Sequence, residues 1–89
     1  MERSFFLRLY NLLMRYFLYA RKSTDVEDKQ VLSIEAQLAE LRALAKRDGL
    51  EIAEEFVEKR SAKMPGRPGF EEMLNRIGRG EAQGIVCWR

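Results

Sequence analysis

Three segments of the chain combine apolar residues with the lengths expected of β-strands. The first is the aromatic run 16–20, which ends abruptly in two cations before Ser23. Residues 50–57 form the second segment, although two adjacent glutamates interrupt its apolar positions. The third is the uninterrupted apolar run 84–88, a pattern typical of a strand that is buried on both faces of a parallel sheet. These patterns predict three strands, with Ser23 at the end of the first.

Two other segments repeat apolar residues at the three- and four-residue spacing of amphipathic helices. Ser33 is a suitable N-cap for the first helix, which we expect to end near Asp48, before Gly49. Pro68 suits the first turn of the second helix, which we expect to end at Gly78. The side chains expected to face the core are Ile34, Leu38, Leu41 and Ala45 in the first helix and Phe70, Met73, Leu74 and Ile77 in the second.

The predicted elements alternate in the order strand, helix, strand, helix, strand. This alternation predicts an α/β fold of three layers, a βαβαβ arrangement around a short parallel sheet with right-handed crossovers. Between the second strand and the second helix, residues 59–67 contain four cations, no acidic residue and a Pro-Gly pair, which predicts an exposed loop.

Composition limits the chemistry that the chain can perform. Its 89 residues, 46% hydrophobic and 34% charged, indicate one small globular domain, and a net charge of +2 does not by itself indicate a nucleic-acid binder. The absence of histidine from the sequence excludes a Ser-His-Asp triad. The single cysteine, Cys87, excludes an internal disulfide, fits a reducing cytoplasm and is expected to lie in the core. One cysteine without histidine cannot form a zinc site, which leaves carboxylates as candidates for a weakly held hard cation.

The apolar segment 1–13 fits no standard targeting signal. Arg8 and Asn11 interrupt it, and the run is too short and too charged for a membrane span or a signal peptide. We therefore expect residues 1–13 to be an extension outside the fold, with Met14 as the working start and no membrane partner. An amphipathic helix that lies on a partner or membrane surface is the alternative.

The carboxyl ends of the three predicted strands lie along one edge of the sheet, where ligands bind in open parallel sheets. Ser23 follows the first strand, Glu58 and the basic loop follow the second, and Arg89 follows the third. Arginine forks bind phosphate oxygens bidentately, so we expect this edge to bind a phosphodiester. The alternative is a solvated basic rim.

Three motifs occur in order along the chain. They are Tyr19-Ala20-Arg21-Lys22-Ser23-Thr24-Asp25, Ser33-Ile34-Glu35-Ala36-Gln37 and Arg67-Pro68-Gly69-Phe70. Together they resemble the catalytic domain of the serine recombinases, the family of resolvases and invertases. The resemblance covers residues 14–89 and implies a resolvase-like fold in which a serine nucleophile cuts and rejoins DNA.

The resemblance also implies roles for individual residues. Ser23 matches the nucleophile that attacks a DNA phosphodiester to form a 5′-phosphoserine bond, and Arg21 and Arg67 match active-site arginines. The supporting positions are Tyr19, Gln37, Glu58 and Ser61, and the cations expected to bind the DNA backbone are Lys22, Lys59, Arg60 and Lys63. The phosphoserine bond keeps the energy of the broken bond, so no ATP, metal or other cofactor is implied.

Each supporting residue also has a purely structural interpretation. Tyr19 would then pack against the sheet, and Gln37 would be exposed on its helix. Glu58 would pair only with a cation next to it in the sequence, Lys59 or Arg60.

Members of the family continue beyond the third strand into an Asp-Arg-x-x-Arg motif, a dimerisation helix and a DNA-binding domain, and they act as dimers or tetramers. We therefore expect this chain to be the truncated front half of a catalytic domain that does not cut DNA alone. Two functions stay open. One is an enzyme, a site-specific DNA recombinase of the cytoplasm, and the other is a non-catalytic truncated remnant that acts as a protein-interaction or DNA-binding α/β module.

Overall fold

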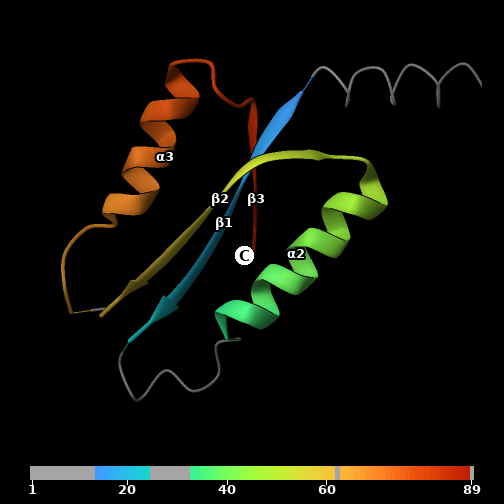
Figure 1. Ribbon diagram of the computed structural model, residues 1–89. Helices are drawn as coiled ribbons and strands as arrows, with labels where there is room; N and C mark the ends of the chain where they lie inside the picture. Colours follow the sequence, from blue (N-terminus) through green and yellow to red (C-terminus); the bar gives the residue numbers. More distant parts are fainter. Residues whose placement is uncertain (1–13, 25–32, 62, 89) are drawn as a thin grey trace, which may run out of the picture.

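A computed structural model describes residues 14–24, 33–61 and 63–88, which contain three strands and two helices (Figure 1). In chain order they are β1 (Arg15–Ser23), α2 (Ile34–Asp48), β2 (Glu51–Arg60), α3 (Pro68–Gly78) and β3 (Gly84–Cys87). The strands form one parallel sheet in the order β2-β1-β3. The predicted α/β class and βαβαβ order are confirmed. The predictions for residues 1–13 and for Arg89 concern positions outside the described ranges.

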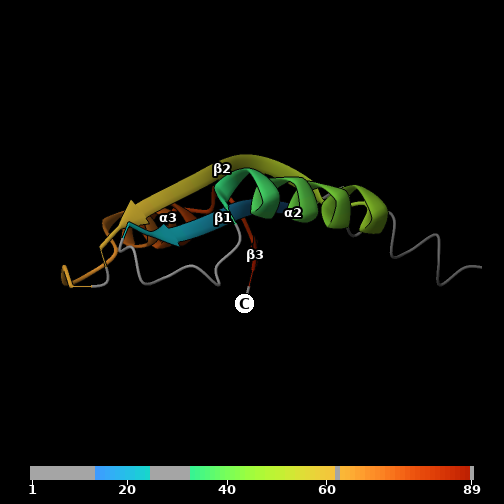
Figure 2. The same ribbon diagram turned by 90° about the horizontal axis from the view of Figure 1, so that it is seen from below.

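The two helices cover opposite faces of the sheet, which gives the three predicted layers (Figure 1 and Figure 2). On the α3 face, the buried core residues are Phe17, Tyr19, Met73 and Ala82. On the α2 face, they are Leu18, Leu41 and Val86. β1 lies between the other two strands and contributes to both cores, because successive side chains of a strand point to opposite faces.

Local capping determines where α2 begins and ends. The Ser33 hydroxyl accepts a hydrogen bond of 3.1 Å from the Ala36 N–H, as an N-cap does. Gly49 adopts a left-handed φ of 72°, and its N–H donates to the carbonyls of Ala45 and Lys46. Both predicted ends of this helix are confirmed.

α3 begins at Pro68, as predicted, but the preceding residue, Arg67, gives it no side-chain cap. Met73 is fully buried at the centre of the predicted core face. Leu74 is 45% exposed, so its predicted burial is wrong: a helix turns by about 100° per residue, which carries this side chain to the edge of the buried face. Neither α2 nor α3, the helices of the described ranges, is long and apolar enough to cross a membrane.

β2 is longer than the sequence predicted, because it runs to Arg60 and not to Val57. Its pairing with β1 explains the difference. The register continues to the pair of Ser23 and Arg60, so hydrogen bonding to a neighbouring strand outweighs the charged side chains at this end. Lys59 and Glu58 are therefore strand residues, and the basic loop begins later than predicted.

β3 packs against the core on both faces, but it is less deeply buried than the sequence predicted. Val86 is 6% exposed and packs on the α2 side, whereas Cys87 is exposed. Within the described ranges β3 lies at an edge of the sheet and pairs with β1 alone. Ile85 packs against the core under α3. Cys87, two residues later at the end of the strand, lies outside the core. The predicted core position of Cys87 is therefore wrong.

Arg76 holds the C-terminal half of α3 against β2. Its guanidinium donates to both carboxylate oxygens of Glu54, at 2.9 and 2.6 Å, and to Glu81 at 2.7 Å. The same group lies 5.2 Å from the ring centre of Phe17 and 5.4 Å from that of Phe56. One of the glutamates that weakened the sequence signal for β2 thus connects this strand to α3.

We predict that Met73→Ala lowers the free energy of unfolding by about 2–5 kcal/mol, because it leaves a cavity under α3. Leu74→Ala, the matched control on the same helix, should change it by about 0.5 kcal/mol or less, since this residue is exposed at the edge of the buried face. Urea titrations followed by far-UV circular dichroism measure both changes. Equal losses for the two variants would show that the buried face assigned to α3 is wrong.

Candidate active site

The carboxyl ends of β1 and β2 bring the predicted site residues to one face of the sheet. Side chains two apart on a strand share a face, so Arg21 and Ser23 follow Tyr19 on the side that α3 covers. The register pairs Arg21 with Glu58 and Ser23 with Arg60. Strand alternation and register thus gather a hydroxyl, a carboxylate and two arginines at the ends of two neighbouring strands.

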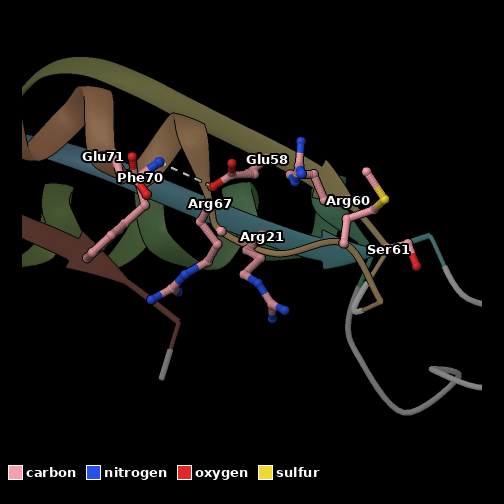
Figure 3. Close-up of a pocket in the computed structure, with 9 residues that line it drawn as sticks. Arg21, Glu58, Arg60, Ser61, Arg67, Phe70 and Glu71 are labelled. Carbon is pink, nitrogen blue, oxygen red and sulfur yellow. Dashed lines mark hydrogen bonds between the residues drawn. The ribbon is translucent and has the colours of Figure 1, made fainter.

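A pocket of about 410 Å³ opens at this end of the sheet (Figure 3). Its lining residues are Arg21, Glu58, Arg60, Ser61, Met64, Gly66, Arg67, Phe70 and Glu71. Figure 3 shows the side chains of Arg21 and Arg67 extending to the same side, one from β1 and one from the segment before α3. Three arginines and two glutamates line this pocket, and guanidinium forks suit an anion with several oxygens, such as a phosphodiester.

Glu58 connects three elements at the floor of this pocket. The residue is only 6% exposed. The carboxylate accepts hydrogen bonds from the Tyr19 hydroxyl, from the Gly69 N–H at 2.7 Å and from the Phe70 N–H at 3.2 Å. Glu58 therefore links β2 to β1 and to the first turn of α3. The interpretation in which it pairs only with Lys59 or Arg60 is wrong.

Burial and hydrogen bonding act in opposite directions on the Glu58 carboxyl. Burial raises its pKa, but the hydrogen bonds from Tyr19, Gly69 and Phe70 outweigh burial and hold the pKa below its usual value. Burial, the hydrogen bond to Glu58 and the charge of that carboxylate raise the pKa of Tyr19 to about 12. At neutral pH Tyr19 is therefore a protonated donor and Glu58 an ionised acceptor.

Gln37 holds the backbone of β1 beside the pocket. It is 2% exposed, so its interpretation as an exposed helix residue is wrong. Its side-chain amide donates to the Arg21 carbonyl at 2.8 Å and accepts from the Arg21 N–H at 3.3 Å. β3 pairs with β1 only as far as Tyr19, so the Gln37 amide satisfies the strand backbone where β3 has ended.

Within the described part of the chain, the Arg67 guanidinium contacts an aromatic ring. Its guanidinium carbon lies 4.5 Å from the ring centre of Phe70, within the range of a cation–π contact. The Phe70 ring in turn meets Tyr19 edge-on, with 5.2 Å between ring centres. Tyr19 therefore does pack against the sheet, as in its structural interpretation. It also contacts Phe70, the ring over which Arg67 lies.

Ser23, the predicted nucleophile, ends β1 and is only 3% exposed. The pocket is lined instead by Ser61, which follows β2 directly. The structure thus places Ser23 next to Arg60 in the register but closed to solvent.

The three lysines predicted to bind DNA do not join the pocket. Lys22 and Lys59 pair with each other across the strands, and alternation turns both toward the α2 face. Lys63 is exposed between β2 and α3, where its N–H donates to the Ser61 hydroxyl at 3.1 Å. Of the four predicted backbone-binding cations, only Arg60 lines the pocket. Its guanidinium also donates to the Pro65 carbonyl at 3.2 Å.

Gly69 and Phe70 were not predicted as site residues, although both belong to one of the three motifs. Phe70 was expected only as a core residue. Gly69 lies in the first turn of α3, where glycine is a poor helix former, so its presence there was the available signal. Its contact with Glu58 explains that choice of residue.

The family model of the resolvase N-terminal domain matches residues 16–89, a range that includes both helices, β2, β3 and all but the first residue of β1. The chain belongs to the resolvase N-terminal domain family. No curated protein and no solved structure matches it significantly. Resolvase-family proteins act on DNA as serine recombinases, which agrees with a pocket whose arginines suit a phosphodiester.

We predict that the stability of this resolvase-family chain falls as the pH is lowered, partly because of Glu58. The pKa of the Glu58 carboxyl is lower in the folded chain than its usual value, which it has in the unfolded chain. Its contribution to stability is therefore complete above the usual pKa and is lost as the pH falls through the lowered pKa of the folded chain. Glu58→Gln should lower the free energy of unfolding at pH 7 by about 1–3 kcal/mol and flatten its decrease between about pH 5 and pH 3.

Urea titrations of wild type and variant at a series of pH values measure this difference. Glu71→Gln is the matched control, because it removes a carboxylate from the exposed rim of the same pocket. A Glu58→Gln profile as steep as that of wild type would contradict the assignment of Glu58 as a stabilising acceptor.

Proposed function

We propose that this chain is the part of a site-specific DNA recombinase, of the resolvase or invertase type, that carries the nucleophile, Ser23. The observation that carries the proposal is the shared direction of the Arg21 and Arg67 side chains in the pocket. This pocket lies at the end of the sheet where Ser23 ends β1. Membership of the resolvase family supports the same kind of reaction.

In the proposed reaction the Ser23 hydroxyl oxygen attacks the phosphorus of a DNA phosphodiester. A new bond forms between this oxygen and phosphorus, the bond from phosphorus to the 3′ oxygen breaks, and the serine proton is released while the leaving oxygen gains one. The products are a 5′-phosphoserine bond and a free 3′-hydroxyl. Arg21 and Arg67 would clamp the non-bridging oxygens, whose negative charge increases in the transition state. Reversal of the same step on another strand would rejoin the DNA.

The burial of Ser23 adds a condition to this proposal. A nucleophile that is 3% exposed must approach the pocket before it meets a phosphate, so the end of β1 would move relative to β2 on DNA binding. Each strand that is cut occupies one serine. Exchange between two duplexes therefore requires several copies of the protein, and the proposal includes action as a homo-oligomer, in the cytoplasm, without a metal or other cofactor.

A DNA-binding module without cleavage is the second candidate, because the arginine pocket is open while Ser23 is closed. Both candidates predict DNA affinity that decreases with salt, since cations that neutralise phosphates release counterions. Only the recombinase predicts a covalent bond between Ser23 and DNA.

We predict that residues 14–89, placed in the corresponding part of an active resolvase-family protein, form a covalent adduct with a nicked DNA site. Denaturing gel electrophoresis would show the adduct as a band of reduced mobility. Ser23→Ala should abolish it. Arg21→Lys should reduce its rate roughly 100-fold or more, because an ammonium group keeps the charge but loses the bidentate fork.

Ser61→Ala is the control for the choice of nucleophile, because Ser61 is the hydroxyl that lines the pocket in this structure. The adduct should persist in Ser61→Ala. An adduct that survives Ser23→Ala and disappears in Ser61→Ala would show that Ser61, and not Ser23, is the nucleophile. The absence of any adduct in the unmodified chimera would favour the binding module.

A further inference from the structure

The contact between Glu58 and Gly69 joins the end of β2 to the first turn of α3. The Glu58 carboxylate accepts the Gly69 N–H at 2.7 Å and the Phe70 N–H at 3.2 Å. The first N–H groups of a helix have no partner within the helix, and the residue before α3, Arg67, makes no side-chain cap. A carboxylate from a neighbouring strand thus performs the capping, with a charge that the helix dipole favours.

A side chain at position 69 would crowd this contact. A Cβ atom built on Gly69 would lie 3.2 Å from the Glu58 carboxyl carbon and 3.3 Å from each of its oxygens. Glu58 is held by Tyr19 on its other side, so it has little freedom to retreat. The close approach of the carboxylate therefore favours glycine in the first turn of α3, although other residues are better helix formers.

The position of Arg67 depends on the same turn of helix. Its carbonyl accepts the first hydrogen bond of α3, from the Glu71 N–H at 3.0 Å. Its guanidinium lies over the ring of Phe70, a residue whose own N–H is bound by Glu58. A shift of the first turn would carry both the backbone of Arg67 and its aromatic support away from Arg21.

We propose that Glu58 and Gly69 are positioning residues that hold the first turn of α3 so that Arg67 and Arg21 reach the same DNA phosphate. Neither residue needs to touch the phosphate. The inference rests on the proposed function, since it takes DNA phosphate as the ligand of the pocket. It makes the loss of a negative charge harmful to the binding of an anion, which is the opposite of what charge alone predicts.

The test measures the affinity of the full chain for a fluorescein-labelled DNA duplex by anisotropy, at several salt concentrations. Glu58→Gln keeps the size of the side chain but removes the charge and one acceptor oxygen. It should weaken binding roughly 3- to 10-fold and reduce the salt slope by about 0.9, the loss of one phosphate contact. Glu71→Gln, the same substitution on the exposed rim of the same pocket, should strengthen binding, because it removes a negative charge that repels DNA.

A second pair of variants tests the same contact without changing any charge. Gly69→Ala should weaken binding as Glu58→Gln does, because its methyl group displaces the carboxylate. Gly78→Ala, at the other end of α3, is the control and should leave binding unchanged, since a Cβ there would meet no atom within 4 Å. In an Arg67→Ala background, Glu58→Gln should cause no further weakening, because the arginine that it positions is gone.

Tighter or unchanged binding in Glu58→Gln and Gly69→Ala would overturn the inference, as would additive weakening of Glu58→Gln and Arg67→Ala. If circular dichroism shows that Glu58→Gln has unfolded, Gly69→Ala decides alone: weaker binding supports the inference, and unchanged or tighter binding overturns it. Failure of the proposed function would be seen in the wild-type chain itself, whose DNA binding would be absent or independent of salt.

Discussion

The burial of one carboxylate constrains how the elements around the pocket can be arranged. Glu58 is 6% exposed, and a charge removed from water to this degree destabilises a fold unless hydrogen bonds replace its hydration. Tyr19 on β1 and the N–H groups of Gly69 and Phe70 on α3 supply those bonds. Because the donors belong to different elements, satisfying Glu58 fixes β1, β2 and α3 relative to one another, and the pocket lies where the three meet.

The two arginines that the proposed reaction uses are each held through the backbone beneath them. Gln37 binds the N–H and carbonyl of Arg21 beyond the last residue that pairs with β3, and the capped turn of α3 carries Arg67. Arg76 fastens the far end of α3 to β2, so that the helix is attached at both ends. Cations held in this way need little rearrangement when charge develops on a phosphate, which is the condition for electrostatic catalysis.

The sequence predicted the features whose signals are local and missed those that depend on distant neighbours. The N-cap of α2, Ser33, could be identified because capping depends on residues within one turn. β2 extends to Arg60 because β1 offers hydrogen bonds, and Cys87 is exposed because β3 lies at the sheet edge; no local pattern contains either fact. Motif resemblance indicated Gln37 and Glu58 as site residues. Their partners are 16 and 11 residues away in the sequence, so how they act required the fold.

The proposed function requires above all that Arg21 and Arg67 form one site for a DNA phosphate. The direct measurement follows the side-chain Nε–Hε resonances of the arginines in ¹H–¹⁵N spectra, assigned by single substitutions, while a short duplex is added at low salt. We expect the resonances of Arg21 and Arg67 to shift together along one saturation curve. The resonance of Arg42, which is paired with Glu55 at 2.6 Å and lies on α2, should stay in place. A shift of only one of the two pocket arginines, or an equal shift of Arg42, would contradict the account.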